Sequence, residues 1–279
     1  MNKGPLVIYH GGCIDGFTAA WIFHKYKLVP LEDLFPAFHR PNKGDVDLPE
    51  VDGRDVIFVD FCPPRHQLME LSLRAMSVLV LDHHKSDMED CQDLPFTHFD
   101  MTKSGAGLAW EHCMSSYEMP WLVRYVQDRD LWSFELPYSK EINAWIGATL
   151  KTMDAWNTLY EEGQNKAFIY GEAALQGIQR YVTEMKPNAR RISFAGYDNI
   201  PVINAPRTHA SELVGELAQD ALFAVSWFHR GDGKFQFELR SRGDFDVSKL
   251  AASFGGGGHK PAAGFTLDSI DLVLGARHA

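Results

Sequence analysis

Three short apolar runs, each ending in acidic or imidazole side chains, constrain the fold of this chain most strongly. They are PLVIYH (5–10), DVIFVDF (55–61) and SVLVLDHH (77–84). Runs of this length that are rich in β-branched residues are typical of buried strands. FTAAWIFHKY (17–26) and RHQLMELSLRAM (65–76) have helical spacing, and GAGLAWEHCM (105–114) begins a further helix. Strands that alternate with helices predict an α/β domain, in which a mainly parallel sheet is flanked by helices.

The polar ends of these runs predict a shared site. Ligand sites in open α/β sheets lie at the carboxyl ends of the strands. The residues expected to converge there are His10, Asp60, Asp82, His83 and His84. A mixed set of carboxylates and imidazoles favours Mn²⁺ over Ca²⁺ or a purely Mg²⁺ site. Two adjacent histidines beside an aspartate seldom serve packing, so the pattern indicates a divalent-metal site.

The second half of the chain has a different organisation. The chain has 279 residues, which fits two domains. Three runs beyond residue 187 read as strands, and HASELVGELAQ (209–219) reads as a helix; the strand runs are NIPVINA (199–205), ALFAVSWF (221–228) and KFQFELRS (234–241). We predict a metal-binding catalytic domain over 1–164, a connecting helix and linker over 165–195, and a small α+β substrate-binding domain over 196–279.

Charge and composition limit the partners of this protein. The formal net charge is -10, which argues against binding to long duplex nucleic acid. No apolar run has the length of a membrane span, and the N-terminus lacks the features of a signal peptide, so we expect a cytoplasmic protein without a membrane partner. The four cysteines form no CxxC pair, and all except Cys13 are expected to be small buried residues. The oligomeric state stays open, with a homodimer as one option.

Five segments of the chain carry a family resemblance. HGGCIDGFTAA (10–20), VIFVDF (56–61), VLVLDHHKS (78–86) and DRDLW (128–132) resemble, in this order, the four motifs of the DHH phosphoesterase superfamily. FGGGGHKPAAGF (254–265) resembles the glycine-rich signature of the DHH-associated C-terminal domain. The resemblance covers nearly the whole chain. The short HGGCIDG form is most similar to the branch of small oligoribonucleases and cyclic-nucleotide phosphodiesterases.

The resemblance implies a metal site with up to two ions. The ligands that it implies are His10, Asp15, Asp60 as the bridge, His83 and one aspartate of the DRDLW motif. Asp130 is the first choice for that aspartate, and Asp128 is the alternative. Cys13 stands where the superfamily usually has a carboxylate for the first metal. Either its thiolate binds a softer ion, or the first site is weak or filled only with substrate. We expect one or two Mn²⁺ ions, with Mg²⁺ or Co²⁺ as alternatives.

The resemblance also implies catalytic and substrate-binding roles. Asp82 would orient a histidine ring, as carboxylates beside metal sites do. His84 would contact the substrate phosphate or assist proton transfer, and His259 would also assist the hydrolysis. The implied phosphate ligands of the C-terminal domain are Arg240, Gly256, Gly257, Gly258 and His259. Glycines allow backbone N–H groups to approach a phosphate, and a guanidinium binds it bidentately. Ser104 is expected to be a helix N-cap rather than a phosphate ligand.

These observations predict a phosphoesterase that uses metal-activated water. The substrates implied by the resemblance are short RNA or DNA oligomers, a linear dinucleotide or 3′,5′-bisphosphorylated adenosine. One alternative is a cyclic-nucleotide phosphodiesterase with the same fold. Another is a nucleotide-binding regulatory module without catalysis, of which Cys13 would be a symptom. The sequence favours an enzyme over this module, because a site without catalysis has no need of buried acids. The residues that carry this argument are His10, Asp15, Asp60 and His83.

Overall fold

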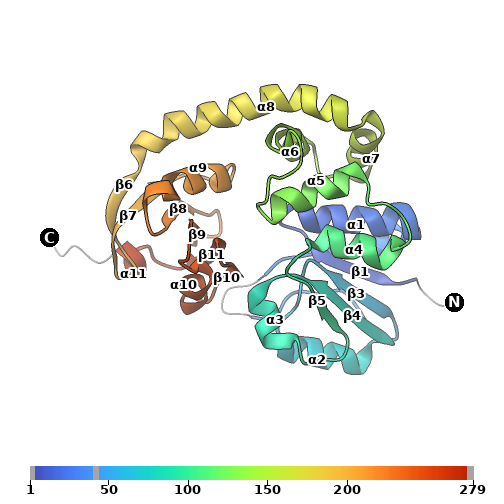
Figure 1. Cartoon of the computed structure of the whole chain (residues 1–279). Helices are drawn as coiled ribbons and strands as arrows, with labels where there is room; N and C mark the ends of the chain where they lie inside the picture. Colours follow the sequence, from blue (N-terminus) through green and yellow to red (C-terminus); the bar gives the residue numbers. More distant parts are fainter. Residues whose placement is uncertain (1–3, 40–43, 275–279) are drawn as a thin grey trace. The chain divides into compact units, whose positions relative to one another are not determined.

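The structure is a computed structural model that describes residues 4–39 and 44–274. Its internal contacts separate the chain into two compact units, with the boundary between Gln176 and Gly177. Each unit has its own sheet (Figure 1). Each unit also has its own hydrophobic cores. The boundary falls inside helix α8 (Gln164–Met185), which occupies most of the segment 165–195 that was predicted to hold a connecting helix.

The first unit contains a five-stranded sheet in the order β2-β1-β3-β4-β5. All four strand pairs are parallel, so the carboxyl ends of the five strands lie at the same edge. The bounds are β1 (Leu6–His10), β2 (Leu34–Ala37), β3 (Asp55–Val59), β4 (Ser77–Asp82) and β5 (Thr97–Phe99). The parallel α/β domain predicted from the three apolar runs is confirmed, whereas the two edge strands β2 and β5 were not predicted.

Helices cover both faces of this sheet, as Figure 1 shows. The side chains of β1 alternate: Val7 and Tyr9 join the core under α1 and α4, and Leu6 and Ile8 join the core under α2. The helix bounds are α1 (Ile14–Lys27), α2 (Arg65–Arg74), α3 (Lys85–Cys91) and α4 (Gly105–Met114), with a short 3₁₀ helix η1 (Leu31–Asp33) before β2. Burial on both faces explains why the central strands are almost uninterrupted apolar runs.

Three further helices complete the first unit. They are α5 (Trp121–Asp130), α6 (Ser139–Ala148) and α7 (Met153–Glu162). Their aromatic residues pack against α1: the ring of Trp156 lies edge-on to that of Phe17 at a centroid distance of 5.0 Å, and Trp156 is fully buried. The aromatic residues of this segment therefore build a core that holds α1 in place.

The second unit contains a six-stranded mixed sheet in the order β10-β11-β9-β8-β7-β6. The pair β7–β8 is parallel and the other pairs are antiparallel. The strands are β6 (Arg190–Phe194), β7 (Tyr197–Asn204), β8 (Ala224–His229), β9 (Phe235–Arg240), β10 (Gly257–His259) and β11 (Ala262–Leu267). Three of them are the strands read from the sequence. Strand β6 lies within the segment expected to be a linker.

Helices pack on both faces of this second sheet. Helix α9 (Ala210–Leu217) covers one face together with the end of α8, and α10 (Val247–Ser253) and α11 (Asp271–Leu274) cover the other. Two 3₁₀ helices, η3 (Lys186–Asn188) and η4 (Ala218–Asp220), join these elements. The predicted small α+β arrangement of this region is therefore present in the structure.

Candidate metal centre

The parallel sheet of the first unit brings the polar strand ends together. His10 ends β1, Asp60 directly follows β3, and Asp82 ends β4. The backbone N–H of Asp60 donates to Leu81 O at 2.9 Å, which fixes this residue beside β4. Asp60 has a left-handed backbone with a φ of 55°. Side chains from three distant parts of the sequence therefore meet at one edge of the sheet.

The start of α4 closes the site from the other side. The backbone N–H groups of Gly105 and Ala106 donate to the carboxylate of Asp15 at 2.6 and 3.1 Å. A Cβ atom on Gly105 would lie 2.3 Å from Asp60 Cβ, so only glycine allows this close approach. The N-cap is Ser104, whose hydroxyl accepts from Gly107 N, as the sequence predicted. A helix N-terminus favours a negative charge, and here it holds the carboxylate of Asp15.

A first group of ligand atoms consists of His10, Cys13 and Asp60. Cys13 Sγ lies 3.0 Å from Asp60 Oδ2 and 3.4 Å from His10 Nδ1. The distance from His10 Nδ1 to Asp60 Oδ2 is 3.6 Å. Burial raises the pKa of the Cys13 thiol well above its usual value, and nearby carboxylates, led by Asp60, raise it further. The thiol therefore keeps its proton unless a cation compensates for the surrounding negative charge.

A second group consists of Asp15, His83 and Asp130. His83 Nε2 lies 3.8 Å from Asp15 Oδ2 and 3.4 Å from Asp130 Oδ2. The same nitrogen lies 3.1 Å from Asp60 Oδ1. Asp60 thus presents Oδ2 to the first group and Oδ1 to the second, and it is only 1% exposed. A carboxylate placed in this way can bridge two cations.

The acids of the second group carry protons more readily than ordinary carboxyls. Burial raises the pKa of Asp15 well above its usual range, and the charges of Asp130 and Asp60 add to this effect. Burial also raises the pKa of Asp130. Burial alone would raise the pKa of Asp60 as well, but the nearby rings of His10 and His83 outweigh burial and hold the pKa of Asp60 well below its usual value.

The pKa of the histidine of the second group is also raised, but by the neighbouring carboxylates rather than by burial. Burial alone would lower the pKa of His83, but its hydrogen bond with Asp60 and the charge of Asp130 raise that pKa to about 9. Without a cation, the ring of His83 is therefore the positive charge that balances these carboxylates at neutral pH.

These residues fit a divalent cation. Among the described residues, Asp130 Oδ2 is a buried oxygen without a hydrogen-bond partner. Leaving a buried acceptor unpaired costs about 1–3 kcal/mol, so the site gains free energy when a cation takes that position. Carboxylate and imidazole ligands suit Mn²⁺, Fe²⁺ or Zn²⁺, and the sulfur of Cys13 shifts the first group towards softer ions.

Asp82 orients the ring of His84, whereas Asp60 lies beside the rings of His10 and His83. Asp82 Oδ1 lies 2.8 Å from His84 Nδ1 and also accepts from the backbone N–H of His83 at 2.8 Å. Burial alone would lower the pKa of His84, but the charge and hydrogen bond of Asp82 raise it well above its usual value. His84 therefore holds a proton more readily than an ordinary histidine, with Nδ1 held by Asp82.

The two aspartates of the DRDLW motif lie in different environments. Asp130 faces His83, as described above. Asp128 Oδ1 accepts from Glu135 N at 2.9 Å, and Oδ2 accepts from the hydroxyl of Ser139. The contacts of Asp128 thus hold the segment between α5 and α6, and only Asp130 belongs to a ligand group.

One residue near the metal centre was not predicted. The ring of His39 lies 5.3 Å from that of His10, 6.0 Å from that of His84 and 4.5 Å from that of Phe61, measured between centroids. His39 follows β2 by two residues, at the edge of the sheet where the other strands end. His39 could have been identified from the sequence as a site residue only if strand β2 had been predicted.

The glycine-rich motif forms a helix end and a strand in the second unit. Gly255 N and Gly256 N donate to the carbonyls of Ala252 and Ala251, which end α10. Gly256 is required by close contact, because a Cβ there would lie 2.1 Å from Gly264 O. Gly257 and Gly258 belong to β10. The N–H group of Gly256, which was predicted from the sequence as a phosphate ligand, is therefore used by the helix end, as is that of Gly255.

Arg240 and His259 lie on neighbouring positions of the second sheet. Ala262 of β11 pairs with Arg240 of β9 on one side and with His259 of β10 on the other. Residues that face each other across antiparallel strands point to the same side of the sheet. Arg240 Nη2 donates to Ser211 Oγ at 2.8 Å, so helix α9 fixes the guanidinium on that side.

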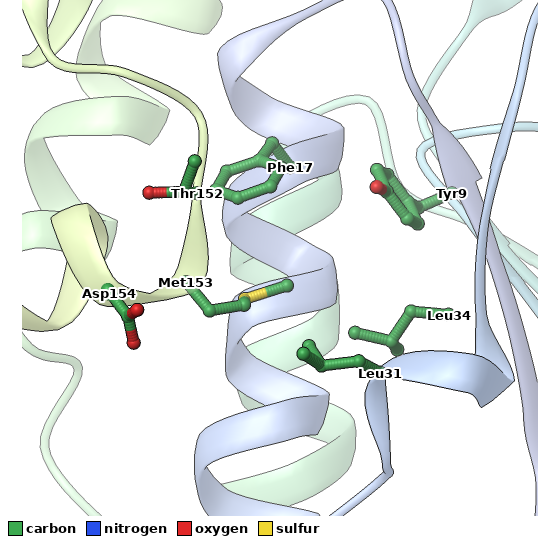
Figure 2. Close-up of a pocket in the computed structure, with 7 residues that line it drawn as sticks. All are labelled: Tyr9, Phe17, Leu31, Leu34, Thr152, Met153 and Asp154. Carbon is green, nitrogen blue, oxygen red and sulfur yellow. The ribbon is translucent and has the colours of Figure 1, made fainter.

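A separate pocket of about 320 Å³ lies in the first unit. Figure 2 shows Tyr9 and Leu34 on one side of it and Phe17 and Met153 on another. Tyr9 precedes His10 in β1, and successive side chains of a strand point to opposite faces. The pocket is thus lined by other residues than the ligand groups, and it opens on the opposite face of the strand from His10.

Comparisons with known proteins agree with the two-unit description. Residues 201–276 match the DHHA1 domain family. Protein R106 of Acanthamoeba polyphaga mimivirus, which is uncharacterized, is 28% identical over 303 residues that cover 98% of this chain and 70% of the viral protein. No helix of the described residues is both long and apolar enough to cross a bilayer.

Solved structures with low sequence identity are also similar. The DHH domain of a member of a family of ribosomal proteins is 14% identical, with a TM-score of 0.51 over 95% of this chain and 83% of that chain. The pGpG-specific phosphodiesterase PggH from Vibrio cholerae is 15% identical, with a TM-score of 0.49 over 96% and 95% of the two chains. The first of these likenesses shows a shared fold. Residues 201–276 thus match the DHHA1 domain family and the fold is similar to that of a DHH domain, in agreement with the resemblance seen in the sequence.

Proposed function

We propose that this protein is a metal-dependent phosphoesterase that hydrolyses short oligonucleotides or small nucleotides. The observation that carries the proposal is the position of Asp60, whose two carboxylate oxygens face two different ligand groups. Two cations that share a carboxylate can stabilise both the attacking and the leaving oxygen of a phosphoryl transfer. The formal net charge of -10 favours a small substrate over a long nucleic acid, because the cations then supply the positive charge that a phosphate needs.

The proposed ligands follow the two groups. The first ion would be held by His10, Cys13 and Asp60, and the second by Asp15, Asp60, His83 and Asp130. A bound Mn²⁺ would lower the pKa of a water ligand and neutralise phosphoryl oxygens. The protein's own contribution is a buried set of acids and one bridging carboxylate, which fix where the phosphate must lie.

His84 is the proposed proton donor. Hydrolysis forms a bond from water oxygen to phosphorus and breaks the bond to the leaving oxygen, which then needs a proton. Asp82 holds Nδ1 of His84, so the proton would leave from Nε2. The charge and hydrogen bond of Asp82 raise the pKa of His84, which favours the protonated ring.

The second unit is proposed to supply anion ligands. Arg240 and His259 flank Ala262 on one side of the sheet, and Ser211 fixes the guanidinium. A held guanidinium loses little side-chain entropy when it binds a phosphate bidentately. Two backbone N–H groups of the glycine-rich motif remain as proposed phosphate donors, those of Gly257 and Gly258. The N–H group of Gly256 would join them if the end of α10 opens.

A substrate panel tests the proposal. Protein purified without chelators is incubated with Mn²⁺ and with short RNA and DNA oligomers, linear dinucleotides, 3′,5′-bisphosphorylated adenosine and cyclic nucleotides. We expect turnover of a linear substrate that falls by at least about 10³-fold in Asp60→Asn. Asp45→Asn is the matched control, since Asp45 is an exposed carboxylate that pairs with His66.

The outcomes separate the alternatives. Preference for cyclic compounds would favour the cyclic-nucleotide phosphodiesterase. Tight nucleotide binding without turnover in Mn²⁺, Mg²⁺ or Co²⁺ would favour a regulatory module. Equal activity of wild type and Asp60→Asn would refute the metal centre.

A further inference from the structure

His39 lies at the edge of the sheet where the metal ligands gather. It follows β2, whose last residue Ala37 pairs with His10 in the parallel register. Gly11 N donates to Ala37 O at 2.9 Å, so the turn after β1 is tied to the segment that carries His39. A Cβ on Gly11 would lie 2.7 Å from the ring of Phe38, which shows how closely the two segments pack. The position of His39 is therefore set by the fold.

The ring of His39 faces the ligand groups from the solvent side. Its centroid lies 5.3 Å from that of His10, with the rings edge-on, and 6.0 Å from that of His84. Asp60 and Asp82 are 1% and 0% exposed, whereas His39 is an exposed residue. A substrate that approaches these buried acids from solvent would meet His39.

His39 has unused hydrogen-bonding capacity. Its ring packs against the buried Phe61 at 4.5 Å. Within the described residues it forms no hydrogen bond and no ion pair. An imidazole with both nitrogens unpaired beside two other imidazoles can donate an N–H to an anion bound there.

We infer that His39 is a substrate-contacting residue, which donates a ring N–H to an oxygen of the phosphoryl group held at the metal centre. This inference rests on the proposed function. It adds a fourth imidazole to the metal ligands His10 and His83 and the proton donor His84. Because a hydrogen-bond donor aimed at a phosphoryl oxygen stabilises charge in the transition state, its removal is expected to lower kcat/KM by about 10²-fold.

Two substitutions separate hydrogen bonding from packing. His39→Phe keeps an aromatic ring against Phe61 and removes the N–H. His39→Gln keeps an N–H donor and removes the ring. With the best substrate of the panel and with bis(4-nitrophenyl) phosphate, we expect kcat/KM to fall about 10²-fold in His39→Phe and less than about tenfold in His39→Gln, at unchanged Mn²⁺ content. His98→Phe, at an exposed position of β5, is the control and should match wild type.

If His39→Phe keeps its kcat/KM and His39→Gln loses it, the inference is overturned. The role of His39 would then be to pack its ring against Phe61. Loss of Mn²⁺ from His39→Phe would also overturn it, because the residue would then support the ions. A binding measurement is independent of turnover: calorimetric titration of Mn²⁺-loaded protein with inorganic phosphate should give about tenfold weaker binding for His39→Phe than for wild type. Equal affinities would refute the contact even if wild type hydrolyses nothing, so this failure differs from failure of the proposed function.

Discussion

The Cys13 thiol donates a hydrogen bond to Asp60 Oδ2 over 3.0 Å, at the place where a second carboxylate would complete the first ligand group. The same sulfur accepts from Gly16 N at 3.2 Å and so caps α1. Because burial and the nearby carboxylates raise the pKa of Cys13, the metal-free first group holds only one negative charge, on Asp60. The second group has two carboxylates of its own. We therefore expect the first group to bind Mn²⁺ more weakly than the second.

Replacement of Cys13 by aspartate is expected to reverse this difference. An aspartate can also cap a helix, so α1 should persist in Cys13→Asp. Without metal, the new carboxylate repels Asp60 and lowers Tm; with Mn²⁺, it is a hard ligand and tightens binding. Thermal unfolding in EDTA and in Mn²⁺ should show a metal-induced rise in Tm several degrees larger than in wild type. Cys113→Ala, at a buried position away from the ligands, is the control, and a rise in Cys13→Asp no larger than in wild type would contradict the assignment.

Asp82 and His84 are expected to act as one unit. Since Asp82 Oδ1 orients the His84 ring at 2.8 Å, Asp82→Asn should lower kcat by a large part of the loss seen in His84→Ala. The double variant should then be little worse than His84→Ala alone, because residues that act through one another are not additive. A double-mutant cycle of kcat tests this. If the kcat loss of the double variant equals the product of the two single losses, Asp82 does not act through His84. It would then act by another contact, for example the hydrogen bond that it accepts from the backbone N–H of His83.

The convergence of His10, Asp60 and Asp82 could be predicted from sequence for a simple physical reason. Buried parallel strands are continuous apolar runs, so their ends are visible, and parallel strands end at the same edge. Edge strands give a weaker signal. Strand β2 (Leu34–Ala37) has four residues and contains Pro36, which edge strands tolerate because one side needs no ladder hydrogen bonds. His39 was missed because β2 was missed.

Other features depended on tertiary contacts that no local pattern encodes. The N-terminus of α4 holds the carboxylate of Asp15, although 90 residues separate Asp15 from Gly105. The sequence favoured Asp130 over Asp128 as the metal ligand of the DRDLW motif but did not exclude Asp128. They differ because Asp130, the last residue of α5, faces His83, whereas Glu135 N and the Ser139 hydroxyl donate to the carboxylate of Asp128.

Substitutions at these two aspartates should have separable effects. Asp128→Ala leaves Glu135 N and the Ser139 hydroxyl without their acceptor, which costs about 1–3 kcal/mol in the free energy of unfolding. Its Mn²⁺ stoichiometry should stay normal. Asp130→Asn removes one of several crowded carboxylates, so the metal-free protein should be at least as stable as wild type while Mn²⁺ affinity falls. Chemical denaturation and metal analysis of both variants provide the test, and metal loss in Asp128→Ala alone would reverse the assignment.

Metal binding is expected to stabilise the protein more as the pH rises. His83 has a pKa of about 9 in the folded protein, above its ordinary value of 6.5, so its charge stabilises the metal-free fold fully below pH 6.5 and this stabilisation is lost as the pH rises through 9. The raised pKa values of Asp15 and Asp130 have the same sign, because their protonated forms favour the metal-free fold. The lowered pKa of Asp60 acts only in acid, below its usual value of 3.8.

A divalent ion requires the opposite protonation states, a neutral imidazole and ionised carboxylates, so Mn²⁺ must displace protons when it binds. Its affinity should therefore rise from pH 6.5 to 8.5 while the Tm of EDTA-treated protein falls, and the gap between the two Tm values should widen. Calorimetric titrations with Mn²⁺ in two buffers of different ionisation enthalpy should give different apparent enthalpies at pH 7. A constant gap in Tm, together with equal enthalpies in both buffers, would mean that the ion binds away from His83, Asp15 and Asp130.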